Sequence, residues 1–235
     1  TGYFAHLFVN PDLKTVPGGM SSTNITDAPV MKLNEVMMNY IEAAAELADM
    51  GQYTLTQGDF DKTINALRNR PSTSMPAVTL AGSNLAVNGV TINDPDRDKG
   101  TMIAGDYEVS PILWEVRRER RTELPYQGIR FNDLRRWGKL HYADMKVNPK
   151  LNLGAWLDKD AYVAWYNEQN GTSLTVEDLK GIHLDRPGNA GYIKPAIDAS
   201  LLRTCEDKHY LYPIPSQEIA LYQSNGYTLS QNPGW

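Results

Sequence analysis

The sequence predicts a mainly α-helical fold with irregular loops and small β-hairpins, and three observations support that class. Apolar residues recur at helical spacing within residues 33–47 and 56–68. The arginine-rich stretch 115–138 also places apolar residues at helical spacing between its charges. Short β-prone runs flank Asn88-Gly89, a strong short-range signal for a hairpin turn.

Composition and charge exclude several classes of function. The chain has 235 residues, of which 41% are hydrophobic and 22% are charged, so it can bury a sizeable core as one or two domains. A net charge of −5 argues against a nucleic-acid partner, because phosphate backbones attract basic surfaces. Cys205 is the single cysteine, so no intrachain disulfide can form. No apolar run is long enough to predict a membrane-spanning helix.

The first helix is expected to follow an irregular segment, residues 1–26, which is rich in proline, glycine and small polar residues. Asp27 is predicted to cap this helix, with Pro29 in its first turn. Gly51 is predicted to end it. The predicted apolar face consists of Leu33, Val36, Met37, Tyr40, Ile41, Ala44 and Leu47.

A second helix is predicted over residues 56–68, with Phe60, Ile64 and Leu67 on one side and Pro71 after its end. Two antiparallel helices with a short joint are similar to one tetratricopeptide-like unit. Such a unit cannot bury its apolar face alone. The sequence therefore predicts a tetratricopeptide-like helical repeat scaffold.

This repeat determines the predicted domain organisation. Residues 1–71 are expected to form the last tetratricopeptide-like helix pair with its preceding loop. Residues 72–235 are expected to pack on that pair as one structural unit. Because a single repeat needs neighbours, we expect this chain to be part of a longer protein with more repeats upstream.

A hairpin is predicted over residues 85–92, and an aspartate-rich turn follows it. Asp94, Asp96 and Asp98 are spaced as in a calcium-binding loop. However, Gly100 comes one place late for such a loop, and no glutamate stands at its last ligand position. We interpret the segment as a turn, with bound calcium as the alternative, and predict no other metal or cofactor.

An arginine-bearing helix is predicted to begin with Ser110 as its cap and Pro111 as its first residue. Its apolar face consists of Ile112, Leu113, Val116 and Leu124. Arg120 falls in the middle of that face, with Glu119 and Glu123 at its edge. A guanidinium that faces a core must be desolvated, and this requires close carboxylate partners.

The next segment repeats the arrangement, since Arg130 lies among three apolar residues that share a face and Asp133 lies beside it. These apolar residues are Phe131, Leu134 and Trp137. We therefore predict a structural ion-pair network that joins the two helices, formed by Arg120, Glu119, Glu123, Arg130 and Asp133.

The remaining predicted elements are short. Asp158 is expected to cap a helix that follows a loop at residues 141–157, and Thr175 with Asp178 forms a capping-box pattern. The β-prone stretches are Tyr192–Lys194 and Tyr210–Tyr212. A last helix is predicted to be capped by Ser216, to carry Ile219 and Tyr222, and to end at Asn225-Gly226.

The sequence offers little support for catalysis. Its four histidines are scattered without the spacing of a metal site, and no nucleophile elbow, P-loop or dinucleotide motif occurs. Glu119, Glu123 and Asp133 stand beside arginines, which lower the pKa of a carboxylate and so disfavour a general acid. We predict that the protein is not an enzyme. The alternative is a glycosidase, which needs two unpaired carboxylates at a catalytic separation.

The aromatic residues indicate binding instead. Thirteen tyrosines and five tryptophans accompany only four phenylalanines, and Tyr and Trp combine a flat apolar face with a polar group. The densest group, and the predicted ligand-binding set, is Trp156, Tyr162, Trp165 and Tyr166. The alternative is that these rings pack the short helix against the arginine-bearing scaffold.

Three stretches together resemble the SusD/RagB family of outer-membrane nutrient-binding lipoproteins. One is ERRTELPYQGIRFNDLRRWG at residues 119–138, and another is KLNEVMMNYIEAAAE at residues 32–46. The third comprises YPIP at residues 212–215, Glu218-Ile219, and QNPGW at residues 231–235. Their order and spacing cover most of residues 28–235.

The resemblance implies a SusD-like fold and a non-catalytic function at the cell surface. Family members bind glycans or other nutrients and deliver them to a SusC-like TonB-dependent transporter in the outer membrane. They are held there by an N-terminal lipid anchor, which we expect to lie upstream of this chain in the full-length protein. Two alternatives remain open, namely a peptide as the ligand and a protein–protein adaptor that acts through the helical repeat.

Overall fold

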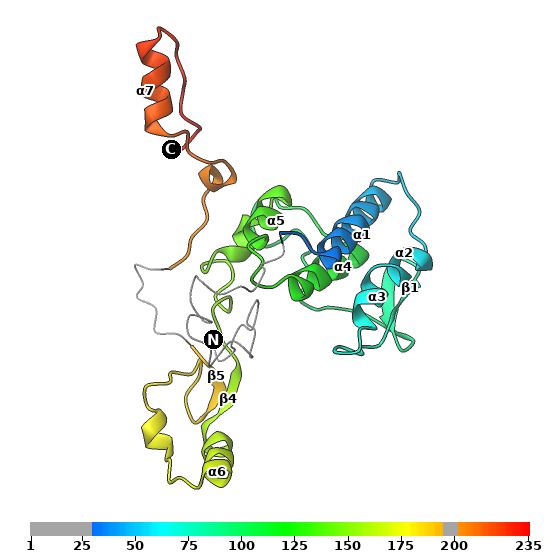
Figure 1. Cartoon of the computed structure of the whole chain (residues 1–235), viewed down its shortest axis with the longest axis vertical. Helices are drawn as coiled ribbons and strands as arrows, with labels where there is room; N and C mark the ends of the chain where they lie inside the picture. The colour runs from blue at the N-terminus through cyan, green and yellow to red at the C-terminus, as the bar shows by residue number, and fades with distance from the viewer. Residues whose placement is uncertain (1–29, 195–201) are drawn as a thin grey trace, which may run out of the picture. The chain divides into compact units, whose positions relative to one another are not determined.

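The computed structural model describes residues 30–194 and 202–235, which belong to two compact units (Figure 1). The first unit contains the described residues up to Arg130, and the second begins at Phe131. The prediction of a mainly helical fold with small antiparallel sheets is confirmed. The predicted division into residues 1–71 and 72–235 stays a prediction.

The first unit is built on α1 (Leu33–Asp49), which packs against α3 (Ile64–Arg68) and α4 (Pro111–Glu123). The predicted start of α1 after Asp27 is wrong, because Lys32 is extended and its carbonyl accepts the first helical hydrogen bond, from Glu35 N at 3.1 Å. Asp27 and Pro29 themselves lie outside the described residues.

The end of α1 agrees with the prediction. Gly51 has a φ of +70°, a conformation that glycine adopts without strain, and Gln52 N donates to Leu47 O at 2.8 Å. The following helix is capped by a box between Thr56 and Asp59.

The single helix predicted over residues 56–68 is wrong, because it is divided into α2 (Gln57–Asp61) and α3. At the break, the Thr63 hydroxyl donates to the carbonyl of Asp59 at 2.5 Å. A threonine side chain that occupies a backbone acceptor competes with the helical hydrogen bond there. The predicted burial of Phe60, Ile64 and Leu67 is confirmed.

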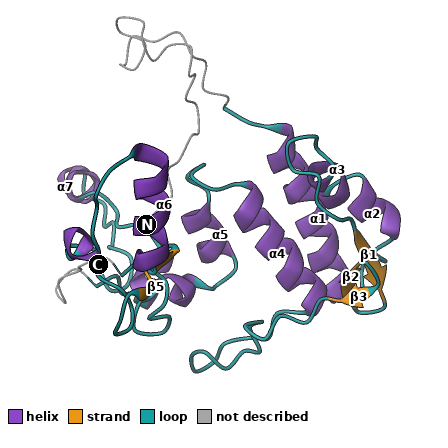
Figure 2. Cartoon of the chain, turned by 90° about the horizontal axis from the view of Figure 1, so that it is seen from below, coloured by secondary structure: helices purple, strands orange, loops and turns teal. Residues whose placement is uncertain are grey.

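A three-stranded antiparallel sheet completes the first unit, in the order β1 (Val78–Ala81), β2 (Asn84–Val87) and β3 (Val90–Thr91). Figure 2 shows the sheet beside α2, and strand β1 contacts that helix. The predicted β2–β3 hairpin is confirmed, and Asn88 and Gly89 have the positive φ values of 51° and 76° that its tight turn requires. β1 was not predicted.

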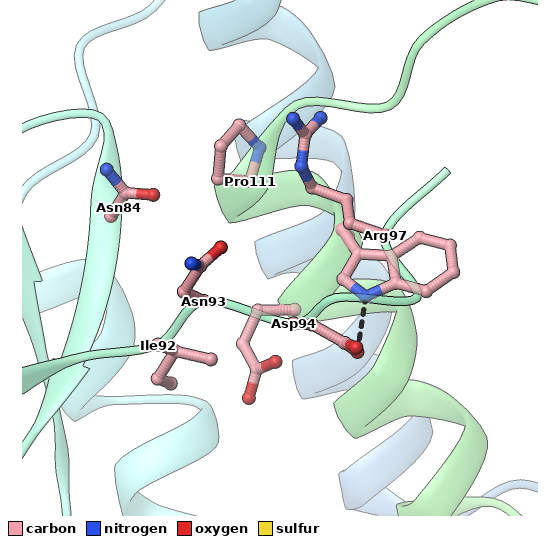
Figure 3. A pocket seen from close by; sticks show the side chains of 8 residues that line it. Asn84, Ile92, Asn93, Asp94, Arg97 and Pro111 are labelled. Carbon is pink, nitrogen blue, oxygen red and sulfur yellow. Dashed lines mark hydrogen bonds between the residues drawn. The ribbon is translucent and has the colours of Figure 1, made fainter. Parts of the chain in front are cut away.

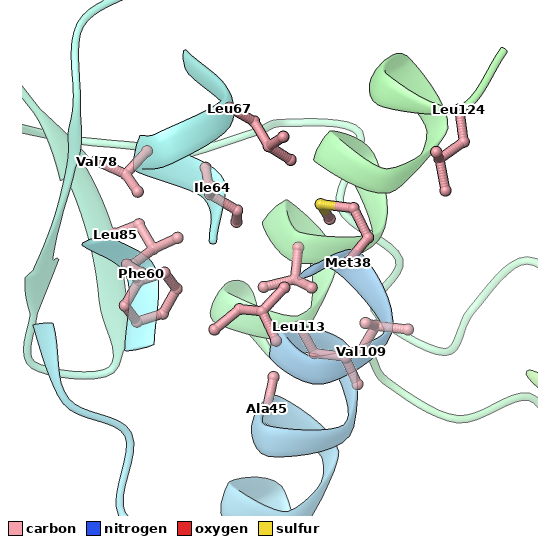
Figure 4. Close-up of a cluster of buried hydrophobic side chains, with 12 residues drawn as sticks. Met38, Ala45, Phe60, Ile64, Leu67, Val78, Leu85, Val109, Leu113 and Leu124 are labelled. Carbon is pink, nitrogen blue, oxygen red and sulfur yellow. The ribbon is translucent and has the colours of Figure 1, made fainter. Parts of the chain in front are cut away.

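Helices α1, α2, α3 and α4 and the sheet enclose the main core, in which their side chains converge (Figure 4). Its buried members are Met38, Ile41, Ala45, Phe60, Ile64, Leu67, Val78, Leu85, Val109, Leu113, Val116 and Leu124. The predicted burial of Leu113, Val116 and Leu124 on α4 is confirmed, and Ile112 packs partly buried against the same core.

The predicted apolar face of α1 is only partly correct. Ile41 and Ala44 are buried, but four other members of that face are exposed. These are Leu33, Val36, Tyr40 and Leu47, at 68%, 47%, 41% and 41% exposure. The predicted apolar face was wider than the part of α1 that contacts other elements. Helices α3 and α4 cover the side of α1 that carries Met38, Ile41 and Ala45.

The second unit contains short elements separated by long loops. They are α5 (Arg130–Arg136), η2 (Leu140–Ala143), β4 (Trp156–Asp158), α6 (Lys159–Asn170), η3 (Val176–Leu179), β5 (Ala190–Tyr192), η5 (Asp207–Tyr210) and α7 (Ser216–Ser224). The Thr175 capping box at η3 is confirmed, with Asp178 Oδ2 accepting from Thr175 N at 2.8 Å.

Leu134, Trp137 and Leu140 form a smaller core in the second unit. Phe131 was predicted on the same face but is 46% exposed. Its ring instead lies under the guanidinium of Arg135, which is 5.7 Å from the ring centroid. A guanidinium over an exposed aromatic ring contributes about 0.5–1 kcal/mol.

Two predictions in the C-terminal segment need correction. Tyr210–Tyr212 is not a strand, since Tyr210 ends η5 and its carbonyl accepts from Arg135 Nη2 at 2.6 Å. Ser216 is the first residue of α7 rather than its cap, because Pro215 occupies the cap position. Among the described residues, no helix has both the length and the hydropathy needed to cross a membrane.

Candidate functional site

The candidate site is built on α6, whose ends follow local rules. Asp158 is the N-cap, as predicted, and its Oδ1 accepts from Ala161 N at 3.0 Å. Gly171 ends the helix with a φ of +62°, where its backbone N–H donates to Asn167 O. The helix is therefore held at both ends while its side chains remain available.

Three predicted site residues come together on this helix. The ring of Tyr162 stacks on Tyr166 with centroids 5.8 Å apart, and it lies 6.0 Å from Trp165. Tyr162 is 37% exposed and Trp165 is 56% exposed, whereas Tyr166 is half-buried. We call these three residues the α6 platform. It is a set of mutually supported rings with open apolar surface.

The fourth predicted residue, Trp156, has a different neighbour. It lies on β4 directly opposite Tyr192 of β5, and the two rings meet edge to face with centroids 5.2 Å apart. The guanidinium of Arg186 lies 5.1 Å from the Trp156 ring centroid. Sequence reasoning missed Tyr192 and Arg186, because only strand pairing brings them to Trp156.

Buried polar contacts fix the loops around α6. Lys159 is buried, and its Nζ donates to the carbonyls of Leu179 at 3.0 Å and Ile182 at 2.8 Å. The Asn167 side chain donates to Leu174 O at 2.8 Å and accepts from Leu174 N at 2.7 Å. These bonds attach the segment after α6 to both ends of the helix, so the platform stands on a rigid support.

The predicted ion-pair residues of the first unit lie on α4. Arg120 is buried, its Nη1 donates to Asn39 Oδ1 at 2.7 Å, and its Nε lies 3.5 Å from Glu42 Oε2. Arg117 lies 3.9 Å from the same Glu42 carboxylate. Asn39 and Glu42 belong to α1, and neither of them was among the residues predicted for the network. Glu42 could have been found from the sequence, because it lies among the apolar residues of a predicted helix, where a carboxylate requires a charged partner.

Glu119 and Glu123 pair with arginines of another segment. Glu119 accepts from Arg68 at 2.5 Å, and Glu123 accepts from both terminal nitrogens of Arg70 at 2.7 and 2.8 Å. In this unit the ion pairs thus connect α4 with α1 and with the end of α3. All of these carboxylates are held by guanidinium groups.

The other two predicted network residues lie on α5. Asp133 is buried and accepts from Arg136 Nη2 at 3.0 Å, one turn later on the same helix. Arg130 is half-buried at the first position of the helix.

A small polar pocket lies between the hairpin, the aspartate-rich turn and α4 (Figure 3). It is lined by Asn84, Ile92, Asn93, Asp94, Arg97, Pro111, Trp114 and Glu115. Asp94 accepts from Trp114 Nε1 at 2.8 Å and from Asp96 N at 2.9 Å, while Asp98 accepts from Gly100 N at 2.7 Å. These bonds agree with the interpretation of an aspartate-rich turn that closes on its own backbone.

Comparison with known proteins gives one match. A family model described as the SusD family matches residues 1–235. The chain matches no curated protein and no solved structure.

Proposed function

This chain belongs to the SusD family, and from that premise we propose that it binds an oligosaccharide through the aromatic side chains of Trp156, Tyr162, Trp165 and Tyr166. Proteins of this family bind glycans at the cell surface without catalysing a reaction. They typically pair with SusC-type TonB-dependent transporters. We propose that this chain delivers its ligand to such a transporter, from a lipid-anchored position on the outer membrane.

The exposed rings of the α6 platform carry the proposal. A pyranose presents C–H groups on one face, and an exposed Tyr or Trp ring offers the flat apolar surface that these groups pack against. Tyr162 and Trp165 keep more than a third of their surface open, which is the surface that a sugar ring would cover. Two-torsion aromatic side chains also lose little conformational entropy on binding.

Affinity electrophoresis against a panel of polysaccharides and peptides tests this proposal. We expect a glycan to retard the wild-type chain, and the double variant Trp165→Ala/Tyr162→Ala to bind it at least about tenfold more weakly, a loss of roughly 1.4 kcal/mol. Tyr227→Ala is the matched control, because Tyr227 is 69% exposed and lies outside the proposed site. Equal retardation of wild type and double variant would remove these residues from the site. Retardation by peptides alone would replace the glycan by a peptide ligand.

One observation favours a second function, protein–protein contact through the helical repeat. Leu33, Val36, Tyr40 and Leu47 lie at helical spacing on α1 and are exposed, and Met31 and Met50 beside them are 66% and 67% exposed. Contiguous exposed apolar residues are typical of interaction sites. We propose that this face of α1 contacts another protein, with the SusC-like transporter as the partner.

Serine substitutions on that face test the contact. The double variant Leu33→Ser/Val36→Ser is expected to lower co-purification of the transporter at least about tenfold, because an apolar interface loses its buried area. Glycan binding should not change, since the α6 platform lies in the other unit. Leu221→Ser, at a 55% exposed position on α7, is the control. Undiminished recovery of the transporter would exclude this face as the contact.

A further inference from the structure

We propose that Trp156, Tyr192, Arg186 and Asp185 form a second sugar-binding subsite, distinct from the α6 platform, that takes an uncharged sugar unit. We call these four residues the β4–β5 subsite. The inference rests on the proposed glycan-binding function and extends it. It assigns Trp156 to a different group of side chains from Tyr162, Trp165 and Tyr166.

Strand pairing creates the apolar part of the subsite. Trp156 and Tyr192 are register partners in the β4–β5 ladder, so both side chains project from the same face of it. Their rings meet at an interplanar angle of 85°, with 52% of Trp156 and 41% of Tyr192 exposed. Two perpendicular aromatic surfaces form a corner, which can contact a sugar ring on its face and on its edge.

The polar part of the subsite is held in place by its own contacts. Arg186 donates through Nε and Nη2 to the two oxygens of Asp185, at 3.1 and 2.9 Å. The same guanidinium lies over Trp156 and Tyr192, 5.1 and 5.8 Å from their ring centroids. Asp185 Oδ1 also accepts from Tyr192 N at 2.8 Å. The ion pair, the contacts of the guanidinium with the two rings and the backbone hydrogen bond thus hold these side chains in one arrangement without a ligand.

Gly191 makes room for this arrangement. A Cβ at residue 191 would stand 2.8 Å from Asp185 Oδ1 and 3.1 Å from Arg186 Cγ. Any larger residue would therefore displace the Asp185–Arg186 pair from the strand. A glycine at position 191 therefore leaves the space that the Asp185–Arg186 pair occupies.

The chemistry of the group matches a sugar diol. Among the described residues, none bonds to Arg186 Nη1, so its N–H groups can donate to a ligand oxygen. A carboxylate has about four lone-pair sites, and Asp185 therefore retains capacity to accept from a ligand hydroxyl. Adjacent hydroxyl groups both donate and accept, and a neighbouring arginine and carboxylate meet both needs.

Local charge favours an uncharged ligand. Asp185 neutralises Arg186, and hydrogen bonds from Arg186 hold the pKa of that carboxyl below its usual range. Within residues 154–194 acidic side chains also outnumber basic ones. An acidic surface repels uronates and sulfated sugars. Two aromatic subsites on one chain further favour a glycan of several units over a single sugar.

Titration calorimetry with a neutral glycan found by the panel, and with an anionic glycan of similar length, tests the subsite. Arg186→Gln and Trp156→Leu in the full chain are each expected to weaken binding of the neutral glycan at least tenfold, with an unchanged thermal midpoint. Lys180→Gln should bind like wild type, since Lys180 is exposed on the same part of the chain and its ammonium group pairs with the exposed Glu177. Trp165→Ala reports separately on the α6 platform.

The outcomes separate the two proposals. If Arg186→Gln and Trp156→Leu bind normally while Trp165→Ala does not, the β4–β5 subsite is excluded, Trp156 is removed from the proposed site, and glycan binding through the α6 platform stands. Tighter binding of the anionic glycan, lost in Arg186→Gln, would overturn the assignment to uncharged sugars. A lower thermal midpoint of Arg186→Gln and Trp156→Leu with unchanged affinity would show that these side chains stabilise the fold and do not bind the sugar. If the wild-type chain binds no glycan, the proposed function itself fails.

Discussion

Replacing Arg120 with alanine is expected to destabilise the protein by about 3–5 kcal/mol, the usual cost of removing one partner from a buried ion pair. Arg120 and Glu42 are both buried, with side chains 5% and 3% exposed. The truncation leaves the Asn39 amide oxygen without its donor and leaves a cavity between α1 and α4. Arg117 remains near Glu42, at 3.9 Å, but it cannot fill that space.

Urea unfolding monitored by circular dichroism measures this loss. Arg121→Ala is the matched control, because Arg121 is the exposed neighbour on the same helix, and its effect should stay below about 0.5 kcal/mol. Glu42→Gln should also be strongly destabilising, since it leaves two buried arginines facing a neutral amide. A loss below about 1 kcal/mol for Arg120→Ala would mean that the arginine behaves as an exposed pair.

The second large effect is expected at Asp59, a buried carboxylate that accepts several hydrogen bonds. Its oxygens accept from Tyr40 Oη at 2.7 Å, Tyr53 Oη at 3.1 Å, Thr56 N at 2.9 Å and Thr56 Oγ1 at 2.8 Å, and Lys62 Nζ lies 3.2 Å away. Asp59→Asn replaces an oxygen acceptor by a donor. We expect it to cost about 2 kcal/mol at neutral pH, within the range for hydrogen bonds to charged groups.

The effect should depend on pH in a defined direction. Burial by itself would raise the pKa of Asp59, but hydrogen bonds from Tyr40 and Thr56 hold it well below its usual range. The stabilisation is therefore fully present above the pKa of an unfolded aspartate, about 3.9, and is lost as the pH falls through the lower folded value. The difference in unfolding free energy between wild type and Asp59→Asn should thus shrink as the pH falls below about 4.

Denaturant titrations at intervals from neutral pH to about pH 3 give that difference directly. Asp49→Asn, at the exposed end of α1, is the control and should show a small effect on the free energy of unfolding. A difference between wild type and Asp59→Asn that is constant over the whole pH range would show that Asp59 is not ionised preferentially in the folded protein.

The elements that depend on neighbouring residues in the chain could be predicted from sequence. Ser110 caps α4, Asp158 caps α6, and Asn88-Gly89 turns the hairpin. In each case the bond or dihedral angle that matters lies within a few residues of the side chain responsible. The family assignment was equally accessible, because its motifs are short stretches of sequence at residues 32–46, 119–138 and 212–235.

The errors arise where an outcome depends on distant segments. Periodicity shows that α1 has an apolar side, but only the positions of α3 and α4 decide that Met38 is buried and Val36 is exposed. Likewise, the apolar periodicity of a helix continues through Thr63 in the sequence. In the structure the helix is interrupted there, where the Thr63 hydroxyl donates to the Asp59 carbonyl. Such choices depend on a competition between contacts that local spacing does not describe.

For the proposed site as well, the sequence determines some of the groupings and the tertiary structure determines the others. The sequence alone identifies Tyr162, Trp165 and Tyr166 as one group, because a helix brings residues three and four apart together. It also identifies Arg120 as an arginine that requires a buried partner. Only the tertiary structure supplies that partner, Glu42, and only strand pairing places Tyr192 beside Trp156. The physical reason is that burial and register depend on contacts between segments far apart in the chain, whereas caps, turns and helix faces depend on their immediate neighbours.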